Sequence, residues 1–207
     1  MASAPELILY TNHTCPWAHR AHIALAELGL PFKEEIIDLN TPRTEAYLKI
    51  NPRGLVPALS YNGEIITESG IVAQFLADAH PSHLLPASDA KDGALRRARI
   101  NFLRRHVLLQ GQPAAGSGFI GAQFVGGEER VWLKQMSGVQ TGSFILRVYS
   151  SAEYGLLPKT IIADLADQAP NFTKWADAVR NKESVNAIYD GEYWVKRTRE
   201  RFAKAKA

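Results

Sequence analysis

The sequence predicts an α/β protein in two parts: a small mixed sheet with helices packed on it, followed by an all-helical part. Three observations lead to this fold class. Short apolar segments alternate with amphipathic ones over the first 80 residues, in the order β-α-β-α-β-β-α. An Asn-Gly pair in that segment marks a hairpin, and beyond residue 88 only helical periodicity remains. We therefore expect domains at residues 1–80 and 89–207, joined by a linker at 81–88.

The composition is that of an ordinary globular protein. Apolar residues make up 46% and charged residues 22% of the 207 residues, which argues against disorder and coiled coil. The formal net charge is +3 and most basic residues are interspersed with acidic ones, so we expect no nucleic-acid partner. No segment has the apolar length of a membrane span or the pattern of a secretory leader, so we expect no membrane contact and a cytoplasmic location.

The first strand and helix are marked clearly. A strand is expected at Glu6–Asn12, where the apolar run Leu7–Tyr10 is bounded by polar residues. A helix is expected between Pro16 and Gly29, because apolar side chains there recur on one helical face and Gly29 supplies a stop. A strand with one partly exposed end should follow at Phe32–Asp38.

A short helix and a hairpin come next. Arg43–Ile50 is expected to be helical and to end before Pro52, since the residue before a proline is disfavoured in the α region. Strands at Val56–Tyr61 and Glu64–Thr67 surround the turn Asn62-Gly63. The hairpin completes the sheet of the first domain.

The remaining elements are helices. The third helix is expected to begin with Thr67 as its N-cap. The glycine-rich run Gly111–Gly127 is expected to be a long loop, and loops of that length usually serve a site. Helices of the second part are expected at Asp89–Gln110, Glu128–Ser150, Ile161–Gln168, Asn171–Asn181 and from Gly191 onward.

Cys15 is the most informative residue. Because it is the only cysteine, it cannot form an internal disulfide or belong to a multi-cysteine metal framework. It lies between the first strand and Pro16, at the expected N-cap of the first helix. Unpaired N–H groups and the positive end of the helix dipole favour a thiolate there, which can attack a disulfide or serve as a nucleophile. The alternative is an inert buried side chain, but the Cys-Pro pair in this setting favours function.

Three segments in this order resemble the glutathione transferase superfamily. They are Cys15-Pro-Trp-Ala-His-Arg20, Asn51-Pro-Arg-Gly-Leu-Val-Pro-Ala-Leu59 and Thr67-Glu-Ser-Gly-Ile71, followed by a linker that ends in Leu84-Leu-Pro86. The resemblance is strong through Ser88 and weaker beyond it. It implies a thioredoxin-like N-terminal domain, an all-helical C-terminal domain and a cysteine-type class that is omega-like or zeta-like, with fungal-type members included.

The resemblance implies glutathione as co-substrate, bound by the first domain. The bond between Val56 and Pro57 is expected to be cis and to present the Val56 backbone to the cysteinyl part of glutathione, as with an added strand. The tripeptide is expected to lie along the outer edge of the sheet. An ordinary trans proline at a strand start is the alternative.

The charged ends of glutathione need partners as well. Ser69 and the helix start suit the γ-glutamyl carboxylate and Glu68 the neighbouring ammonium, although both residues also suit ordinary helix capping. The glycine carboxylate needs a cation, for which Arg43 is the first candidate and Arg53 the competitor.

Two residues compete for activation of glutathione. In an omega-like class, Cys15 forms a mixed disulfide with glutathione. In a zeta-like class, the hydroxyl of Thr14 hydrogen-bonds a glutathione thiolate, although that class has serine at this position. Tyr10, the tyrosine-type alternative, lies early on the strand. We rank Cys15 first, Thr14 second and Tyr10 last.

The second substrate is expected in a pocket between the domains, as in the superfamily. His106 either points into this pocket or is a hydrogen-bonded core histidine, which is the commoner state. Phe119 and Phe124 in the glycine-rich loop, and Tyr193 and Trp194 near the C-terminus, could line it. Ordinary packing explains each aromatic residue equally well.

A metal centre is not expected. Cys15, His19 and His22 have a spacing on one helix that lets them approach a common ion, and His13 is near. A fourth ligand is not indicated, and Cys15 has a better explanation in glutathione chemistry.

Several functions follow from the resemblance. The leading hypothesis is a glutathione transferase that directs the glutathione thiolate to a small hydrophobic electrophile. The alternatives are a glutathione-dependent cis–trans isomerase acting on an unsaturated acid or natural product, a thiol transferase that uses Cys15, and a non-catalytic binding or scaffold module. The resemblance also implies a homodimer.

Overall fold

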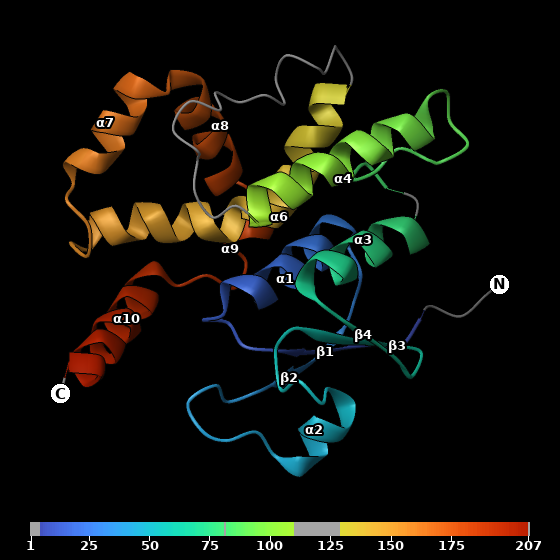
Figure 1. The fold of residues 1–207 in the computed structure, drawn as a ribbon, viewed down its shortest axis with the longest axis horizontal. Coiled ribbons are helices and arrows are strands. Elements are labelled where there is room, and N and C mark those ends of the chain that lie inside the picture. Colours follow the sequence, from blue (N-terminus) through green and yellow to red (C-terminus); the bar gives the residue numbers. More distant parts are fainter. Residues whose placement is uncertain (1–4, 81, 110–128, 207) are drawn as a thin grey trace.

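A four-stranded mixed sheet forms the first part of the computed structural model, which describes residues 5–80, 82–109 and 129–206 (Figure 1). The strand order is β2-β1-β3-β4; β1 pairs parallel with β2, and the pairs β1–β3 and β3–β4 are antiparallel. The elements of this part are β1 (Leu7–Thr11), α1 (Pro16–Glu27), β2 (Lys33–Ile36), α2 (Glu45–Ile50), β3 (Ala58–Tyr61), β4 (Glu64–Thr67) and α3 (Ser69–Ala79).

The sheet is covered unequally on its two faces. Helices α1 and α3 lie on one face, between the sheet and the helical part, and α2 lies on the other side (Figure 1). Leu7, Leu9 and Thr11 alternate with half-buried residues along β1, as expected for a strand with one fully buried face. The main core begins between the sheet and α1 and continues through α3 to helices of the second part.

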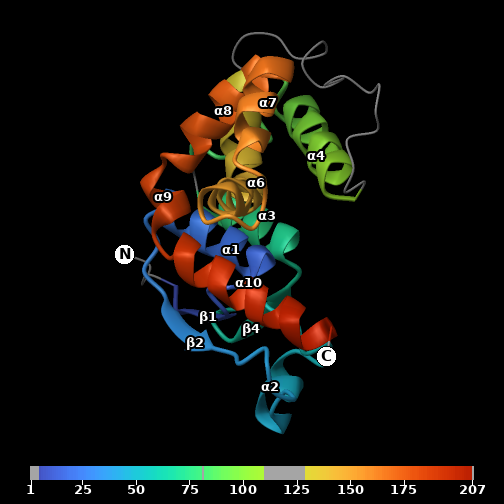
Figure 2. The same ribbon diagram turned by 90° about the vertical axis from the view of Figure 1, so that its left-hand side faces the viewer.

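The second part consists of helices. Its described elements are α4 (Gly93–Leu109), α6 (Glu129–Glu153), α7 (Thr160–Gln168), α8 (Pro170–Arg180), α9 (Glu183–Asn186) and α10 (Gly191–Lys206). The long helix α6 packs against α1, α4, α8 and α10, so it joins the sheet part to the rest (Figure 2). Together with the sheet order, this arrangement confirms the predicted α/β and all-helical fold class. None of the helices in the described ranges is long and apolar enough to cross a bilayer.

Two details differ from the predictions, and a third is not tested. Helix α3 begins at Ser69, and its N-cap is Glu68 rather than Thr67. Glu68 has a positive φ of 69°, which is not a helical angle, so the helix cannot begin before Ser69. Helix α9 was not predicted, since its 4 residues are too short to show a period. The predicted loop at Gly111–Gly127 lies outside the described residues.

One buried ion cluster joins the two parts. The carboxylate of Glu27, at the end of α1, accepts hydrogen bonds from Lys182 Nζ at 3.1 and 3.2 Å and from the hydroxyl of Ser184. His83 Nε2 lies 2.8 Å from its second oxygen. Burial opposes ionisation, but these donors together hold the pKa of Glu27 below its usual value. Glu27 thus links α1, the linker and the segment that contains α9.

Candidate functional site

Cys15 lies at the N-cap of α1, as predicted. Its backbone is extended, with φ −82° and ψ 118°, and Pro16 occupies the first turn of the helix. The thiol is half-buried beside the small cluster of Ala18, Tyr47 and Val56. Its Sγ lies 4.0 Å from the carbonyl oxygen of Val56, at the outer limit for a sulfur donor. The sulfur therefore sits between a helix N-terminus and the backbone that was predicted to receive glutathione.

The hydroxyl of Thr14 is engaged within its own loop. Both the backbone N–H and the Oγ1 hydroxyl of Thr14 donate to Asn12 Oδ1, at 3.0 and 2.6 Å. The amide nitrogen of Asn12 donates in turn to the carbonyl of Ile37 at 2.9 Å. Because the hydroxyl proton is already used, Thr14 must break this bond before it can donate to a thiolate. The geometry therefore favours Cys15 over Thr14 as the reacting group.

A buried cation approaches the same turn from the helical part. Arg147 on α6 is only 5% exposed, and its Nη2 donates to the carbonyl of Thr14 at 3.1 Å. Its Nη1 donates to the carbonyl of Ser143 at 2.8 Å, and the guanidinium lies 5.1 Å from the ring centre of Tyr189 and 5.4 Å from that of Trp194. Burial lowers the pKa of Arg147 to about 10, while Tyr189 and Cys15 act in the opposite direction. Arg147 therefore stays charged at neutral pH, within electrostatic reach of Cys15.

The turn before β3 has the predicted cis bond between Val56 and Pro57. The preceding carbonyl, that of Leu55, accepts hydrogen bonds from the hydroxyl of Tyr47 at 2.6 Å and from Asn51 Nδ2 at 2.7 Å. Burial raises the pKa of Tyr47, so the phenol keeps the proton that it donates. The turn that presents Val56 is therefore fixed from α2.

The position of this turn corrects one expectation. The outer strands of the sheet are β2 and β4, whereas Val56 precedes β3, an inner strand. A tripeptide that meets the Val56 backbone cannot lie along the outer edge of the sheet. It must lie at the end of the inner strands, beside the N-terminus of α1.

Glu68 and Ser69 stand at the start of α3, but both already have partners. The exposed carboxylate of Glu68 pairs with Arg53 Nη1. The hydroxyl of buried Ser69 accepts a hydrogen bond from Arg20 Nη1 at 3.3 Å, and Arg20 in turn lies 4.3 Å from the ring centre of Trp17. The hydroxyl of Ser69 keeps its own proton for a further acceptor.

Arg43 holds the loop in which it lies. Its Nε donates to the carbonyl of Gly54 at 2.9 Å, and its Nη1 to the carbonyls of Asp38 and Thr41 at 2.6 and 2.7 Å. These bonds tie the segment after β2 to the segment before β3. The predicted role of Arg43 toward a glycine carboxylate stays a prediction.

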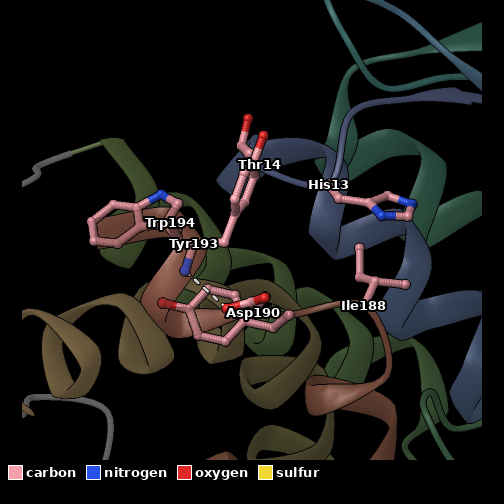
Figure 3. A pocket seen from close by; sticks show the side chains of 7 residues that line it. His13, Thr14, Ile188, Asp190, Tyr193 and Trp194 are labelled. Carbon is pink, nitrogen blue, oxygen red and sulfur yellow. Dashed lines mark hydrogen bonds between the residues drawn. The ribbon is translucent and has the colours of Figure 1, made fainter. Parts of the chain in front are cut away.

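A cavity of about 140 Å³ opens between the loop before α1 and the start of α10 (Figure 3). The backbone N–H of Tyr193 donates to Asp190 Oδ1 at 2.9 Å and so fixes the first turn of α10. Trp194, predicted for the second-substrate pocket, lies in this wall together with Thr14. The cavity is lined by His13, Thr14, Ile188, Tyr189, Asp190, Tyr193 and Trp194.

The structure does not describe the side chains of three other residues predicted for the pocket. Phe119 and Phe124 lie outside the described residues. His106 lies within α4, but its side chain is not among those that the structure describes. Their roles stay predictions.

The histidines of α1 do not gather at Cys15. His19 is fully buried and stacks on Tyr189 with ring centres 6.0 Å apart. Burial is the largest cause that lowers the pKa of His19 to about 3, with Arg147 acting in the same direction. His22 points to the opposite side, where its Nε2 lies 2.8 Å from Thr11 Oγ1. Burial lowers its pKa to about 4 despite the opposite effect of Glu34.

Comparison with known proteins decides the family. Residues 14–79 match the family model described as glutathione S-transferase, N-terminal domain. A probable glutathione transferase of Aplysia californica is 35% identical over 88 residues, which are 42% of this chain and 95% of that protein. The chain belongs to the glutathione transferase superfamily.

Two other similar proteins match this chain over a smaller share of their own length. The probable glutathione S-transferase GSTU1 of Oryza sativa subsp. japonica is 33% identical over 135 residues, or 57% of this chain and 58% of that protein. The maleylacetoacetate isomerase of Pseudomonas aeruginosa is 36% identical over 96 residues, or 44% of this chain and 43% of that protein. The chain thus spans about half the length of these two curated relatives.

A solved structure supports the fold over nearly the whole chain. Glutathione transferase Omega 2C from Trametes versicolor has a TM-score of 0.73 and 27% identity, and the match covers 96% of this chain and 99% of that chain. The thioredoxin-like first part and the helical remainder of the chain are therefore shown.

Arg147 is a residue of this site that sequence reasoning missed. Its signal was present, because it is a lone basic residue in the apolar run Phe144-Ile-Leu-Arg-Val148. A charged side chain within such a run is either paired in the core or exposed by a bend of the helix. Only the packing of α6 on α1 shows that its partner is the carbonyl of Thr14.

Proposed function

We propose that this glutathione transferase is a thiol transferase in which Cys15 exchanges disulfides with glutathione. The observation that carries the proposal is the position of the Cys15 sulfur. It stands at the N-terminus of α1, 4.0 Å from the carbonyl of Val56, with the buried guanidinium of Arg147 bound to the adjacent residue. The helix N-terminus and the guanidinium both place positive charge near this sulfur.

Glutathione is proposed to lie across the ends of the inner strands. Its cysteinyl backbone pairs with Val56, which brings its sulfur beside Cys15. The γ-glutamyl carboxylate meets the hydroxyl of Ser69, and its ammonium competes with Arg53 for the carboxylate of Glu68. At the other end, the glycine carboxylate meets Arg43 through Nη2, because Nε and Nη1 donate to backbone carbonyls.

The chemistry proceeds in two exchanges. The thiolate of Cys15 attacks the glutathionyl sulfur of a mixed disulfide between glutathione and a second thiol; a Cys15–glutathione disulfide forms and the second thiolate leaves. The thiolate of another glutathione then attacks the glutathionyl sulfur held by Cys15. Oxidised glutathione leaves and the Cys15 thiolate is restored, so the net reaction converts one glutathione thiol and the mixed disulfide into oxidised glutathione and the free second thiol.

The cavity beside Thr14 suits the second group of the substrate. Its volume of about 140 Å³ and the side chains of Tyr193 and Trp194 fit a small hydrophobic or aromatic group. Because this wall contains Thr14, a group bound there lies next to Cys15. We therefore propose that the second thiol of the mixed disulfide carries a small hydrophobic group.

A second candidate is glutathione conjugation or cis–trans isomerisation with Thr14 as the activating hydroxyl. It is supported by the place of Thr14 in the cavity wall and by the Pseudomonas isomerase among the relatives. The 2.6 Å hydrogen bond from the Thr14 hydroxyl to Asn12 ranks it second. In this chemistry the glutathione thiolate adds to a conjugated double bond, and elimination after rotation returns the glutathione.

The test compares Cys15→Ser, Cys15→Ala and Thr14→Val with the unchanged chain. Three activities are measured: exchange with a glutathione mixed disulfide, conjugation to an aryl halide, and isomerisation of maleylacetoacetate. We expect both Cys15 variants to lose the exchange activity. They should also lack the Cys15–glutathione disulfide, which mass spectrometry detects as an added mass on the protein. Thr14→Val should keep both the activity and the disulfide.

Three results would count against the proposal. Full exchange activity in Cys15→Ala would remove Cys15 from the mechanism, and loss of conjugation or isomerisation only in Thr14→Val would favour the second candidate. Calorimetry that detects no saturable binding of millimolar reduced glutathione would favour a non-catalytic module instead.

A further inference from the structure

Three side chains that the proposed reaction does not use converge below the loop before α1. The Nε2 atom of His13 lies 2.8 Å from Glu34 Oε1, and the Nε2 atom of His22 lies 3.3 Å from the same oxygen. All three potential ligand atoms lie within 4.8 Å of one another. Figure 3 shows the His13 ring pointing away from Trp194, so it faces this cluster while its residue borders the cavity.

The three side chains come from three parts of the first domain: Glu34 from β2, His22 from α1 and His13 from the loop before α1. Glu34 pairs in register with Leu9 of β1, and this register places Glu34 on the face of the sheet that meets α1. His22 projects from the middle of α1 and is only 3% exposed. Its ring lies edge-on against Phe32, with ring centres 5.7 Å apart. The buried ligand is thus held firmly before any ion arrives.

The other two ligands have room to adjust. The side chains of His13 and Glu34 are 44% and 31% exposed, and His13 stands in the loop between β1 and α1. In a tetrahedral zinc site with metal–ligand distances of about 2.0–2.2 Å, neighbouring ligand atoms are about 3.4 Å apart. The two separations from Glu34, 2.8 and 3.3 Å, lie at or below this value and no pair exceeds 4.8 Å, so small rotations of His13 and Glu34 complete the geometry.

We propose that His13, His22 and Glu34 form a binding site for a divalent transition metal ion of the zinc type. Two imidazole nitrogens and one carboxylate oxygen are ligands that zinc and its neighbours prefer over magnesium or calcium. The exposed side of the cluster leaves a coordination position for water. The ligands considered from the sequence were Cys15, His19 and His22, whereas this cluster combines His22 and His13 with Glu34 from β2.

This site goes beyond the glutathione reaction and has a consequence for it. An ion bound here joins the loop of His13 to β2, and His13 is two residues from Cys15. The ion therefore restrains the turn that presents the reacting sulfur. It takes no part in the disulfide exchange itself.

The experiment titrates the full chain, without any polyhistidine tag, with zinc chloride by calorimetry and with cobalt chloride by visible absorption. We expect one ion per chain, the visible bands of a low-symmetry cobalt site, and a higher melting temperature with zinc. His13→Ala and Glu34→Gln, both at exposed positions, should each weaken binding at least about tenfold, since even outer partners of a metal site have effects of that size. His22 is left unchanged because it is buried in the core.

Two matched variants show whether the ion occupies this cluster. His83→Ala breaks another histidine–carboxylate pair, in which Nε2 lies 2.8 Å from Glu27 Oε2, and should leave zinc affinity unchanged. Cys15→Ser removes the only thiol and should also leave it unchanged, whatever happens to glutathione exchange. The proposal is overturned by absence of saturable binding, by unchanged affinity in His13→Ala and Glu34→Gln, or by binding that disappears with Cys15 or His83.

Discussion

The guanidinium of Arg147 donates a 3.1 Å hydrogen bond to the carbonyl oxygen of Thr14, the residue that precedes Cys15. The two residues are 133 positions apart in the sequence, and the bond joins α6 to the turn at the N-terminus of α1. A buried cation is costly to desolvate, so it is retained where it has hydrogen-bond acceptors or an anion to face. Here the carbonyls of Thr14 and Ser143 accept hydrogen bonds from the guanidinium, and the sulfur of Cys15 lies within electrostatic reach.

Replacement of Arg147 should therefore slow the chemistry of Cys15. We expect Arg147→Met to react with a thiol-alkylating reagent at neutral pH roughly tenfold more slowly, which corresponds to about 1.4 kcal/mol of lost electrostatic stabilisation. Arg147→Lys keeps the charge without the planar fork and should show a smaller loss. The measurement is the alkylation rate of Cys15, on variants whose folding is checked by circular dichroism.

Arg180 provides the control for this prediction. It also lies over an aromatic ring, 4.6 Å from the ring centre of Tyr149, but it pairs with Asp177 and belongs to α8. Arg180→Met should leave the alkylation rate unchanged. Equal rates in Arg147→Met and the unchanged chain would limit Arg147 to a structural role.

Glu68 should show a conflict between stability and ligand binding. Its φ of 69° and ψ of 113° are unfavourable for any residue with a Cβ atom, and its pair with Arg53 is exposed and weak. Glu68→Gly should raise the free energy of unfolding by about 1 kcal/mol and weaken glutathione binding at least tenfold, about the loss of one charged hydrogen bond. Urea unfolding and calorimetry measure the two effects.

Glu68→Gln separates the backbone from the carboxylate. Glutamine keeps the unfavourable backbone angle, so this variant should weaken glutathione binding without any gain in stability. An equal gain in both variants would mean that backbone relief is not the cause.

Features set by neighbouring residues could be predicted from the sequence, and those set by distant packing could not. The N-cap position of Cys15 follows from the strand before it and from Pro16, and the hairpin follows from Asn62-Gly63. In contrast, the partner of Arg147 depends on how α6 packs against α1. Glu34 falls within the strand expected at Phe32–Asp38, but its two histidine partners lie on α1 and in the loop before it, so the local sequence does not show the cluster.

The carboxylate of Glu27 should contribute measurably to stability, because it is only 11% exposed and has partners from the linker and from α9. We expect Glu27→Gln to lower the free energy of unfolding by about 2 kcal/mol. The pKa of Glu27 is lowered in the folded chain, so this contribution is present above about pH 4.5 and is lost as pH falls through the folded pKa. Urea unfolding at neutral and acidic pH measures both the loss of stability in Glu27→Gln and its dependence on pH.

Glu200 is the matched control for Glu27. It pairs with Arg197 at 3.0 Å on α10, where its side chain is 44% exposed. Exposed pairs of this kind contribute about 0.5 kcal/mol or less, so Glu200→Gln should change stability little at any pH. A similar loss in both variants would contradict a special role for the buried cluster.

His19 should make the folded chain sensitive to mild acid. Its pKa is about 3 in the folded chain, chiefly because it is buried, and its ordinary value is 6.5. Between these two values the unfolded chain holds more protons, so stability falls as pH drops below 6.5, by up to about 1.4 kcal/mol per pH unit. Above this range His19 is neutral in both states and contributes no pH dependence.

His19→Phe tests this account because it keeps a ring against Tyr189 but removes the titrating group. Its free energy of unfolding, measured in urea by tryptophan fluorescence, should decline less steeply than that of the unchanged chain between about pH 6 and about pH 4. His80→Phe, which replaces a histidine that is only partly buried at the end of α3, should keep the original slope. If the slope persists in His19→Phe and disappears in His80→Phe, the acid sensitivity does not arise from the histidine that α1 buries beside Tyr189.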